Sequence, residues 1–385
     1  MAKLGEVCDI LNGYAFKSNQ YTTSGVRIIR ISNVQKGYIE DKSPVYYPCD
    51  DENVKKYELK QNDLLISLTG NVGRTALLEE KFLPAALNQR VSCVRLKEPD
   101  KVLKTYLFHL LNSDYFEQQC MKAAEGVAQK NLSPKWLFEY KIPIYSIERQ
   151  KEISNTLDKI DLLIILRKQQ LAKLNELVKA RFVEMFGTFP ANPFRWDTGK
   201  IQDVVSDVRY GSSRPAVEGG KYPYLRMNNI TYSGELDLRD TKRIDIPDSE
   251  LDKCTVRRGD VLFNRTNSKE LVGKTCVYNR DELMVLAGFV IRVRVNERMR
   301  PEVLSAFLNM DFSKRMLIGM CKTAIGQANI NAKELQNIDL YIPPIELQDQ
   351  FVALKNKIDQ QKQTVQQSLE KLELMKKALM QEYFG

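Results

Sequence analysis

The segment "NLSPKWLFEYKIPIYSIERQ" (Asn131–Gln150) returns in altered form as "NINAKELQNIDLYIPPIELQ" (Asn329–Gln348). A shift of 198 residues aligns the two segments without a gap, and the match continues until "EMFG", ending at Gly187, lies over "EYFG", ending at Gly385. Roughly a third of the aligned positions are identical, far more than unrelated sequences would give over such a run. The chain is therefore predicted to be a tandem repeat.

The repeat continues upstream in a looser form. Each half is predicted to consist of a variable globular part followed by a more uniform tail. Gln129 and Gln327 recur in it, which favours a role in the shared framework or on a phosphate over base reading. The upstream matches are "GVRIIRISNV" (25–34) over "KYPYLRMNNI" (221–230), "QNDLLISLTGNVGRTALL" (61–78) over "RGDVLFNRTNSKELVGKTCVY" (258–278), and "GVAQKN" (126–131) over "AIGQAN" (324–329).

The two tails show apolar residues at steps of three and four, which is the heptad pattern of a coiled coil. Each begins after proline and ends in Phe-Gly, a plausible helix C-cap. A helix of about 40 residues spans roughly 60 Å. A pseudo-two-fold axis between the halves would pair the helices antiparallel; the alternative is two separate helices, each packed on its own domain. The predicted seam comprises Ile153, Leu157, Ile160, Ile164, Leu171, Leu174, Val178, Ile358, Val365, Leu369, Leu372 and Leu379, with Arg167, Lys362 and Lys376 at weaker sites.

The globular parts contain short β-branched runs such as "VRIIRISNV" and "FVIRVRV", punctuated by Gly, Asn and Asp. This favours an α+β fold with a curved sheet in each part and helices near 102–112 and 301–310. The predicted organisation is a first globular domain at 1–145, a first spacer helix at 146–187, a linker at 188–199, a second globular domain at 200–343 and a second spacer helix at 344–385.

The net charge of +9 points to a polyanionic partner, and nucleic acid is the usual one. The tails are nearly balanced in charge, so most of the excess lies on the globular parts. Two basic domains on a rigid spacer suit the reading of two separated half-sites on one duplex; basic domains without a nucleic-acid role are the alternative. The sequence shows no apolar run long enough for a membrane span and no signal peptide. Its seven scattered cysteines predict buried thiols in the cytoplasm, not disulfides or zinc ligands.

The sequence contains only incomplete matches to enzyme motifs. Gly273-Lys274-Thr275 matches the end of a P-loop, but Ser268 stands where its first glycine belongs, and the first half has Arg74 in place of the lysine. A glycine turn between strands is predicted instead, with the basic residue on a DNA phosphate or as a plain surface charge. The single histidine, His109, is expected beside a core, and one histidine argues against a metal site or a triad.

The whole chain resembles the specificity (S) subunit of type I restriction–modification systems. The two segments before the tails are similar to that family's Asn-Leu-Ser … Ile-Pro-Leu-Pro-Pro-Leu-Glu-Glu-Gln junction. The second copy, with Pro343-Pro344, matches better than the first, which has Tyr145-Ser146 where prolines are usual. "LGEVCDILNGYAFKS" (4–18) and "GDVLFNRTNS" (259–268) also look like the family's target-recognition domains.

The resemblance implies two target-recognition domains that read the parts of a split sequence in double-stranded DNA, separated by an antiparallel coiled coil. It implies two modification subunits that methylate adenine N6 with S-adenosylmethionine, and restriction subunits, using ATP and magnesium, as optional further partners. None of these cofactors is expected in this chain, which would be non-catalytic. The unlike sequences of the two domains predict an asymmetric target.

Arg, Lys, Asn and Gln are the residue types that read base edges. The candidate DNA contacts are Arg, Lys and Asn residues on loops, with two tyrosines packing on DNA. They are Tyr14, Lys17, Arg30, Asn33, Asn71 and Arg74 in the first domain, and Tyr210, Arg214, Arg226, Asn228, Arg265, Asn267 and Lys274 in the second. Two other classes of function stay open: a self-contained DNA methyltransferase or nuclease, and a coiled-coil scaffold that binds proteins only.

Overall fold

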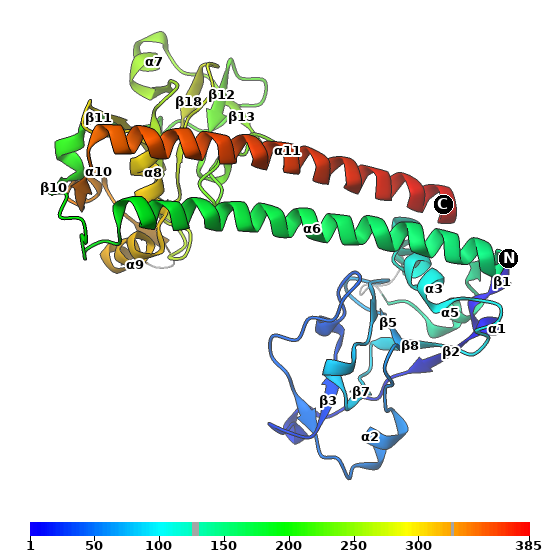
Figure 1. The fold of residues 1–385 in the computed structure, drawn as a ribbon. Helices are drawn as coiled ribbons and strands as arrows, with labels where there is room; N and C mark the ends of the chain where they lie inside the picture. The colour runs from blue at the N-terminus through cyan, green and yellow to red at the C-terminus, as the bar shows by residue number, and fades with distance from the viewer. Residues whose placement is uncertain (125–130, 325–326) are drawn as a thin grey trace. The chain divides into compact units, whose positions relative to one another are not determined.

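The computed structural model describes residues 1–124, 131–324 and 327–385, and Gln129 lies outside them. The chain forms two compact units, residues 1–167 with 367–385, and residues 168–366. Each unit contains one globular part and one half of each long helix (Figure 1). The mixture of small sheets, short helices and two long helices confirms the predicted α+β class.

The first globular part is built on a four-stranded antiparallel sheet in the order β2-β8-β5-β6. In its buried strand β5, Leu64 and Ile66 face a core shared with the helices, whereas Leu65 faces a core shared with a second sheet, β4-β3-β7. This alternation explains the unbroken apolar run "DLLISL", because both faces of the strand are covered. The strands are β1 (Ala2–Lys3), β2 (Cys8–Asn12), β3 (Val26–Ile29), β4 (Tyr46–Tyr47), β5 (Leu64–Ser67), β6 (Thr75–Leu77), β7 (Ala85–Leu87), β8 (Val91–Leu96) and β9 (Lys141–Ile142).

The second globular part repeats this plan. Its sheet β11-β19-β15-β17 corresponds to β2-β8-β5-β6, and β12 pairs with β18 in parallel as β3 pairs with β7. Leu262 of β15 faces the second sheet, as Leu65 does in β5. The strands are β10 (Asp197–Lys200), β11 (Val205–Tyr210), β12 (Tyr222–Leu225), β13 (Lys242–Ile244), β14 (Thr255–Val256), β15 (Val261–Asn264), β16 (Thr266–Asn267), β17 (Thr275–Val277), β18 (Met284–Leu286), β19 (Val290–Val295), β20 (Lys322–Ala324), β21 (Gln327–Asn329) and β22 (Asp339–Ile342).

Short helices cover the sheets, and the two predicted helices appear as α3 and α8. Each is followed by another helix, α4 or α9, that packs behind the glycine turn of its sheet. The helices are α1 (Leu4–Val7), α2 (Glu52–Lys56), α3 (Lys104–Leu111), α4 (Asp114–Ala123), α5 (Pro134–Glu139), α6 (Ile147–Phe186), α7 (Asp248–Cys254), α8 (Pro301–Asn309), α9 (Asp311–Met320), α10 (Ala332–Gln336) and α11 (Ile345–Phe384).

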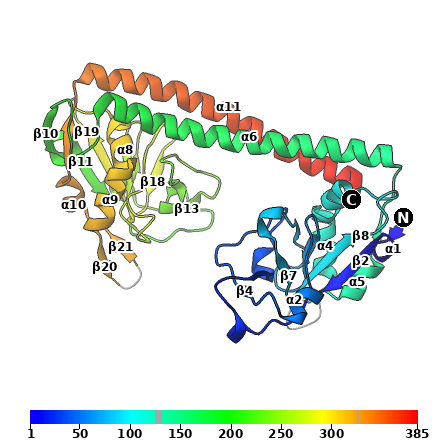
Figure 2. The ribbon, with the colours of Figure 1, turned by 60° about the horizontal axis from the view of Figure 1, so that its bottom comes forward.

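The long helices α6 and α11 pair antiparallel in both units. In the first unit Lys376 of α11 forms an ion pair with Asp161 of α6. In the second unit Phe351, near the start of α11, packs on Phe182 and Phe186, near the end of α6. Figures 1 and 2 both draw the two helices side by side. The alternative of two helices, each packed only on its own domain, is therefore wrong.

All twelve residues of the predicted seam are buried or half-buried. Two of the basic residues at the weaker seam sites take part in ion pairs: Lys376 with Asp161 and the buried Lys362 with Glu235, on a loop of the globular part. Gly187 ends α6 with a φ of 82°, the left-handed conformation expected of a helix C-cap.

One buried glutamine in each repeat joins the long helix to the globular part. The Oε1 of Gln150 accepts a hydrogen bond from the backbone N–H of Leu103 (2.8 Å), and its Nε2 donates to two backbone carbonyls. Gln348 makes the same three bonds, accepting from the N–H of Arg300 (2.8 Å). Both side chains are 0 % exposed. Leu103 and Arg300 are the N-cap residues of α3 and α8, so each glutamine fixes its long helix to the first turn of a domain helix.

Two details differ from the sequence-based expectation. The predicted linker, 188–199, is shorter, because Asp197–Lys200 forms β10 and pairs with β22 of the second unit. All seven cysteines are free thiols, but Cys49 is exposed, so the expectation that every thiol is buried is wrong.

The variant Gln348→Leu tests the glutamine contact. It would leave one buried N–H and two buried carbonyls without a partner, and we expect the free energy of unfolding of the second unit to fall by about 2–4 kcal/mol. Urea unfolding followed by circular dichroism measures the change. Gln363→Leu, at an exposed position of the same helix, is the control and should leave the transition unchanged; equal midpoints for the two variants would contradict the assignment.

Candidate nucleic-acid interface

The glycine turn that resembles a P-loop is a framework element. Gly273 has a φ of 76° and lies between the antiparallel strands β15 and β17, not between a strand and a helix. A Cβ atom at Gly273 would meet the side chain of Leu317 in α9 at 2.6 Å, so the turn needs glycine for both conformation and space. The turn at Gly73 in the first unit has a φ of 84° and packs on Cys120 of α4 in the same way.

The basic residue after each glycine turn holds a neighbouring loop. The ammonium group of Lys274 is buried and donates a hydrogen bond to the carbonyl oxygen of Met227 (3.0 Å). Burial lowers the pKa of this lysine. The prediction of a phosphate contact or a surface charge at Lys274 is therefore wrong. Arg74, its half-buried counterpart, donates to the Oε1 of Gln35 (2.6 Å) on the equivalent loop.

A second pair of predicted readers also belongs to the framework. Asn33 is 4 % exposed; its Oδ1 accepts from the N–H of Arg30 (2.8 Å), and its Nδ2 donates to the carbonyl of Glu40 (2.9 Å). In the second unit Asn229 makes the equivalent bond to Arg226 (2.9 Å). Because both polar ends of Asn33 are occupied inside the protein, its prediction as a base reader is wrong. Its structural counterpart is Asn229, not Asn228.

The arginines next to these asparagines are half-buried and partly engaged. Arg30 donates to the carbonyl of Ser43 (2.7 Å), and Arg226 donates to Asp240, with a 3.1 Å contact between Nη2 and Oδ2. Both therefore stabilise the loop that follows β3 or β12 in its unit.

Five predicted DNA contacts are exposed: Lys17, Asn71, Tyr210, Arg214 and Asn228. Arg214 forms a two-point ion pair with Glu250, with oxygen–nitrogen distances of 2.7 and 3.2 Å.

Three predicted residues of the second unit lie on or next to its strands: Tyr210 at the end of β11, Arg265 directly after β15 and Asn267 in β16. The guanidinium of Arg265 lies 4.8 Å from the centre of the Tyr210 ring, and the Tyr210 hydroxyl accepts a hydrogen bond from the N–H of Ala332 (2.8 Å). Asn267 is half-buried, and its Oδ1 accepts from the N–H of Ser268. The predicted roles of these residues on DNA stay predictions.

A set of backbone hydrogen bonds, which we call the strand-end frame, joins the ends of three strands in the first unit. The N–H of Tyr14, after β2, donates to the carbonyl of Leu87 (3.0 Å), and the N–H of Gln89 donates back to Tyr14 (2.8 Å). The N–H of Leu68, after β5, donates to the carbonyl of Arg90 (2.9 Å). The β7–β8 turn is thereby fixed between the ends of β2 and β5, the two strands that flank β8 in the sheet.

The second unit contains the same frame. Ser212 donates to Leu286 (2.7 Å), Gly288 donates back to Ser212 (2.7 Å), and Arg265 donates to Phe289 (3.0 Å). Because the bonds match one by one, the frame shows which residues of the two units are structural counterparts, where the sequence alignment is ambiguous. Tyr14 corresponds to Ser212, so the other predicted tyrosine, Tyr210, is not its structural counterpart.

The frame also contains exposed residues that the sequence analysis missed: Gln89, Arg90 and Phe289. A signal for them exists, because "LNQRVSCVRL" (87–96) aligns with "LAGFVIRVRV" (286–295), and the two segments differ most in the turn before the strand. The matched positions are Tyr14 with Ser212, Leu68 with Arg265, Gln89 with Gly288, and Arg90 with Phe289.

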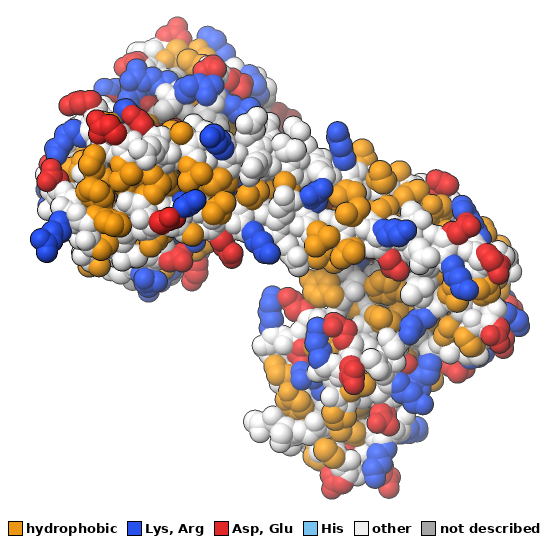
Figure 3. All heavy atoms as spheres, viewed as in Figure 1, with side chains coloured by type: hydrophobic (Ala, Val, Ile, Leu, Met, Phe, Trp, Pro, Cys, Tyr) orange, Lys and Arg blue, Asp and Glu red, His pale blue; other side chains and the backbone are white. Residues whose placement is uncertain are grey.

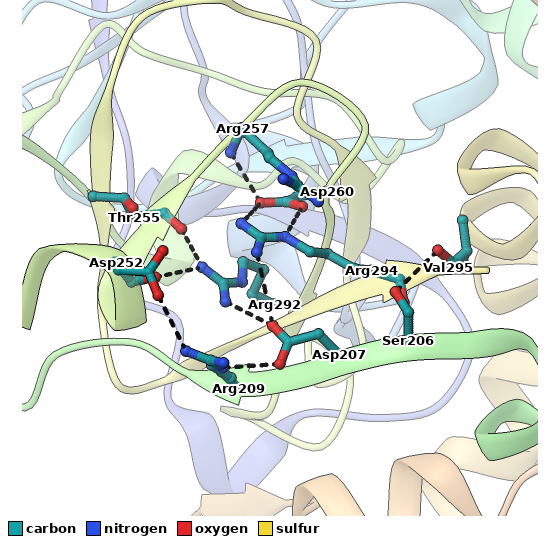
Figure 4. A network of polar contacts seen from close by, with 10 residues as sticks. All are labelled: Ser206, Asp207, Arg209, Asp252, Thr255, Arg257, Asp260, Arg292, Arg294 and Val295. Carbon is teal, nitrogen blue, oxygen red and sulfur yellow. Dashed lines mark hydrogen bonds and ion pairs between the residues drawn. The ribbon is translucent and has the colours of Figure 1, made fainter.

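Several arginines of the second unit are unsuited to DNA because they form an internal network (Figure 4). Arg292, 1 % exposed, donates to Asp207 (2.7 Å) and to two backbone carbonyls at the end of α7. Burial opposes ionisation of Asp207, but hydrogen bonds from Arg292 and Arg209 outweigh it and hold the pKa of that carboxyl below its usual range. Arg294 is paired with Asp260 (2.8 Å). This part of the positive charge stabilises the fold.

The described residues contain no group of three or more His, Cys, Asp and Glu side chains placed to hold a metal ion. His109 is 2 % exposed, and its Nε2 lies 2.8 Å from the Oδ1 of Asp158 in α6, so it lies beside a core as predicted. No helix in the described part of the chain combines the length and the apolar character of a bilayer span.

Comparison with known proteins identifies the family. The model of the type I restriction modification DNA specificity domain matches residues 1–176 and 193–374, and the chain belongs to this family. The chain is 22 % identical over 378 residues to the EcoKI type I restriction enzyme specificity subunit of Escherichia coli (strain K12), covering 91 % of this chain and 80 % of that one. It is 32 % identical over 186 residues to the MjaVIII specificity subunit of Methanocaldococcus jannaschii, covering 46 % of this chain and 43 % of that one.

Solved structures share the fold. A chain from a structure of a type I restriction–modification system aligns over 100 % of this chain and 96 % of its own length, with a TM-score of 0.60 and 19 % identity. The type I specificity subunit of M. genitalium aligns over 100 % of this chain and 95 % of its own, with a TM-score of 0.58 and 14 % identity.

A buried lysine behind the glycine turn generates a pH prediction. Lys314 of α9 is 8 % exposed and donates to the carbonyl of Gly273 (2.5 Å); burial, with Lys179 and Lys274 nearby, lowers its pKa to about 7. In the unfolded chain this lysine has an ordinary pKa of about 10.4. Between about pH 7 and pH 10 the unfolded chain therefore binds more protons than the folded chain, so the free energy of unfolding rises with pH over this range. We expect Lys314→Met to raise the melting temperature at pH 7 and to reduce its increase between pH 7 and pH 9.

Differential scanning calorimetry at both pH values measures this effect. Lys333→Met, at an exposed position, is the control and should retain the pH dependence of the unaltered chain. An unchanged pH dependence in Lys314→Met would show that Lys314 keeps an ordinary pKa.

Proposed function

We propose that this member of the type I restriction–modification DNA specificity family reads a split, asymmetric sequence in double-stranded DNA, one part with each globular unit. The observation that carries the proposal is the duplicated strand-end frame, which presents unlike side chains on one backbone arrangement. Two copies of one reader with different exposed residues are suited to two different half-sites. The net charge of +9 supports binding to the phosphate backbone.

We further propose that the chain selects the target but does not modify it. Two polar groups with the chemistry of catalytic residues serve the fold instead: His109 contacts the long helix, and Lys274 anchors a loop. Methylation of adenine N6 with S-adenosylmethionine, and any cleavage with ATP and magnesium, would then belong to modification and restriction subunits in the cytoplasm. A self-contained methyltransferase would transfer label from S-adenosylmethionine to DNA without any partner, and this assay separates the two.

The outer face of α6 supports docking of the modification subunits. Leu162, Leu163, Ile165 and Leu166 are 56, 42, 52 and 48 % exposed in one run of the first unit. Figure 3 shows apolar side chains gathered along the visible face of the long helices. A contiguous exposed apolar patch of this kind typically marks a protein interface. The equivalent positions of α11 are Gln360, Gln361, Gln363 and Thr364, so two docked subunits would meet surfaces of unequal apolar character.

The double variant Leu162→Gln, Ile165→Gln tests the docking face. It introduces the residues that the second repeat has at these positions, so helix formation and the buried seam should be retained. We expect at least a tenfold loss of affinity for the modification subunit, measured by analytical ultracentrifugation, with unchanged DNA binding. Gln169→Ala on the same helix is the control; equal affinity of both variants for the modification subunit would contradict docking on this face.

Genome-wide mapping of N6-methyladenine in the host, with and without the gene, tests the proposed function. We expect one asymmetric split motif to lose methylation when the gene is removed. Titration of labelled duplexes at rising salt adds a direct test, because affinity that rests on phosphate contacts falls steeply with salt. An unchanged set of methylated motifs together with no DNA binding would favour a protein-only scaffold.

A further inference from the structure

We propose that the residue at the tip of the β7–β8 turn in the first unit, and its counterpart after β18 in the second, choose bases in the two half-sites. Arg90 selects a guanine, and Phe289 selects a thymine. The inference rests on the proposed function and deepens it, because it assigns one base contact to each globular unit.

The two residues occupy the same place on the strand-end frame. The carbonyl of Arg90 accepts a hydrogen bond from Leu68, and the carbonyl of Phe289 accepts one from Arg265. Each turn is also fixed by a bond to the segment after the first strand of its sheet, at Tyr14 or Ser212. A rigid backbone with an outward side chain is the arrangement that sequence reading needs, because a base contact discriminates only when its position is fixed.

Other parts of the framework repeat with similar or identical residues and are buried. The glycine turns, the loop asparagines and the helix-anchoring glutamines are the same residue type in both units. At the tip the residue type changes from a cation to an aromatic ring, whereas the backbone hydrogen bonds stay the same. Of the two residues only Arg90 has a positive φ, so what repeats is the hydrogen-bond pattern. A position of repeated hydrogen bonds and changing exposed side chain is where two copies of one domain can differ in what they bind.

Arg90 has the chemistry of a guanine reader. Its side chain is exposed, and among the described residues none forms an ion pair or side-chain hydrogen bond with it. Gln89, exposed beside it, adds a second donor and acceptor. The φ of Arg90 is 69°, a left-handed conformation that costs a residue with a Cβ about 1–2 kcal/mol relative to glycine. A guanidinium pairs with O6 and N7 of guanine in the major groove through two parallel hydrogen bonds.

Phe289 has the chemistry of a thymine reader. Its ring is 55 % exposed at a turn that lies close to the segment after β11: a Cβ atom on the adjacent Gly288 would lie 3.2 Å from the carbonyl oxygen of Ser212. The neighbouring Tyr210 is 39 % exposed and lies beneath the guanidinium of Arg265. An apolar ring among polar groups distinguishes thymine by contact with its C5 methyl group, which no other DNA base pair presents in the major groove.

Selection of full-length chain on a library of duplexes with randomised half-sites tests both assignments. The unaltered chain should enrich one split sequence, and Arg90→Ala should lose a guanine preference in one half-site only, by about tenfold or more. Phe289→Ala should lose a thymine preference in the other half-site only. Lys60→Ala and Leu283→Ala, at exposed positions before β5 and β18, are the matched controls and should select the original sequence. Melting temperatures confirm that each variant is folded.

Base analogues then identify the contacted atoms. Replacing the selected guanine by 7-deazaguanine should weaken binding of the unaltered chain but not of Arg90→Ala. Replacing the selected thymine by deoxyuridine, which lacks the methyl group, should weaken binding of the unaltered chain but not of Phe289→Ala. Loss of the analogue effect in the matching variant, and in no control, supports the inference.

Two results would overturn it, and they are distinguishable. If the unaltered chain enriches a split sequence and both variants enrich the same bases, the tip residues do not read DNA and only this inference fails. If the unaltered chain enriches no sequence at any salt concentration, the proposed function fails and the inference fails with it.

Discussion

A buried glutamine fixes the start of each long helix to its globular part, in addition to the apolar contacts that the helix shares with the domain core. Gln150 and Gln348 each satisfy one N–H and two carbonyls with a fully buried side chain, at the point where the chain leaves a domain and enters a helix of 40 residues. An unsatisfied group here would cost about 1–3 kcal/mol, so the three bonds select one direction for the helix relative to the first turn of α3 or α8. In each unit the orientation of the reading surface relative to its stretch of spacer follows from that direction.

In the globular parts, the positions that require a particular residue type are different from the positions whose residue type can vary. The hydrogen bonds of the strand-end frame run between backbone groups, so they set few requirements on the side chains that they carry. The positions that do require a particular residue are those where side chains close the structure: glycine against a packed helix, and asparagine across a loop. A domain of this kind can change its exposed tip without changing its core.

The sequence predicted the elements that arise from periodic burial. The seam of α6 and α11, the repeat and the positions of α3 and α8 follow from the spacing of apolar residues, since burial of one face is what forms a long helix. It did not predict which polar residues are available to a ligand. Asn33 and Lys274 have the residue types of DNA readers, but Asn33 bonds to the carbonyl of Glu40 in its own loop, and Lys274 bonds to the carbonyl of Met227, 47 residues away in the chain. Residue type alone reports neither partner. Arg90 and Phe289 were not predicted because they are unlike residues at equivalent positions of the two halves, as readers of unlike half-sites should be.

A buried position of the central strand shows how far the two copies have diverged within one fold. Leu65 pairs with Cys93 in the first unit, and its equivalent Leu262 pairs with Arg292 in the second. The thiol needs no partner there, whereas the two terminal nitrogens of the guanidinium need hydrogen-bond acceptors, which Asp207 and the end of α7 supply. Exchange of Arg292 for cysteine alone would leave Asp207 without its main partner, and exchange of Cys93 for arginine would bury an unpaired charge, the costlier error. In the second unit the guanidinium of Arg292 therefore joins the sheet to the end of α7, whereas the first unit has the small thiol of Cys93 at the equivalent position. The two domains share a backbone plan, but their cores are not interchangeable.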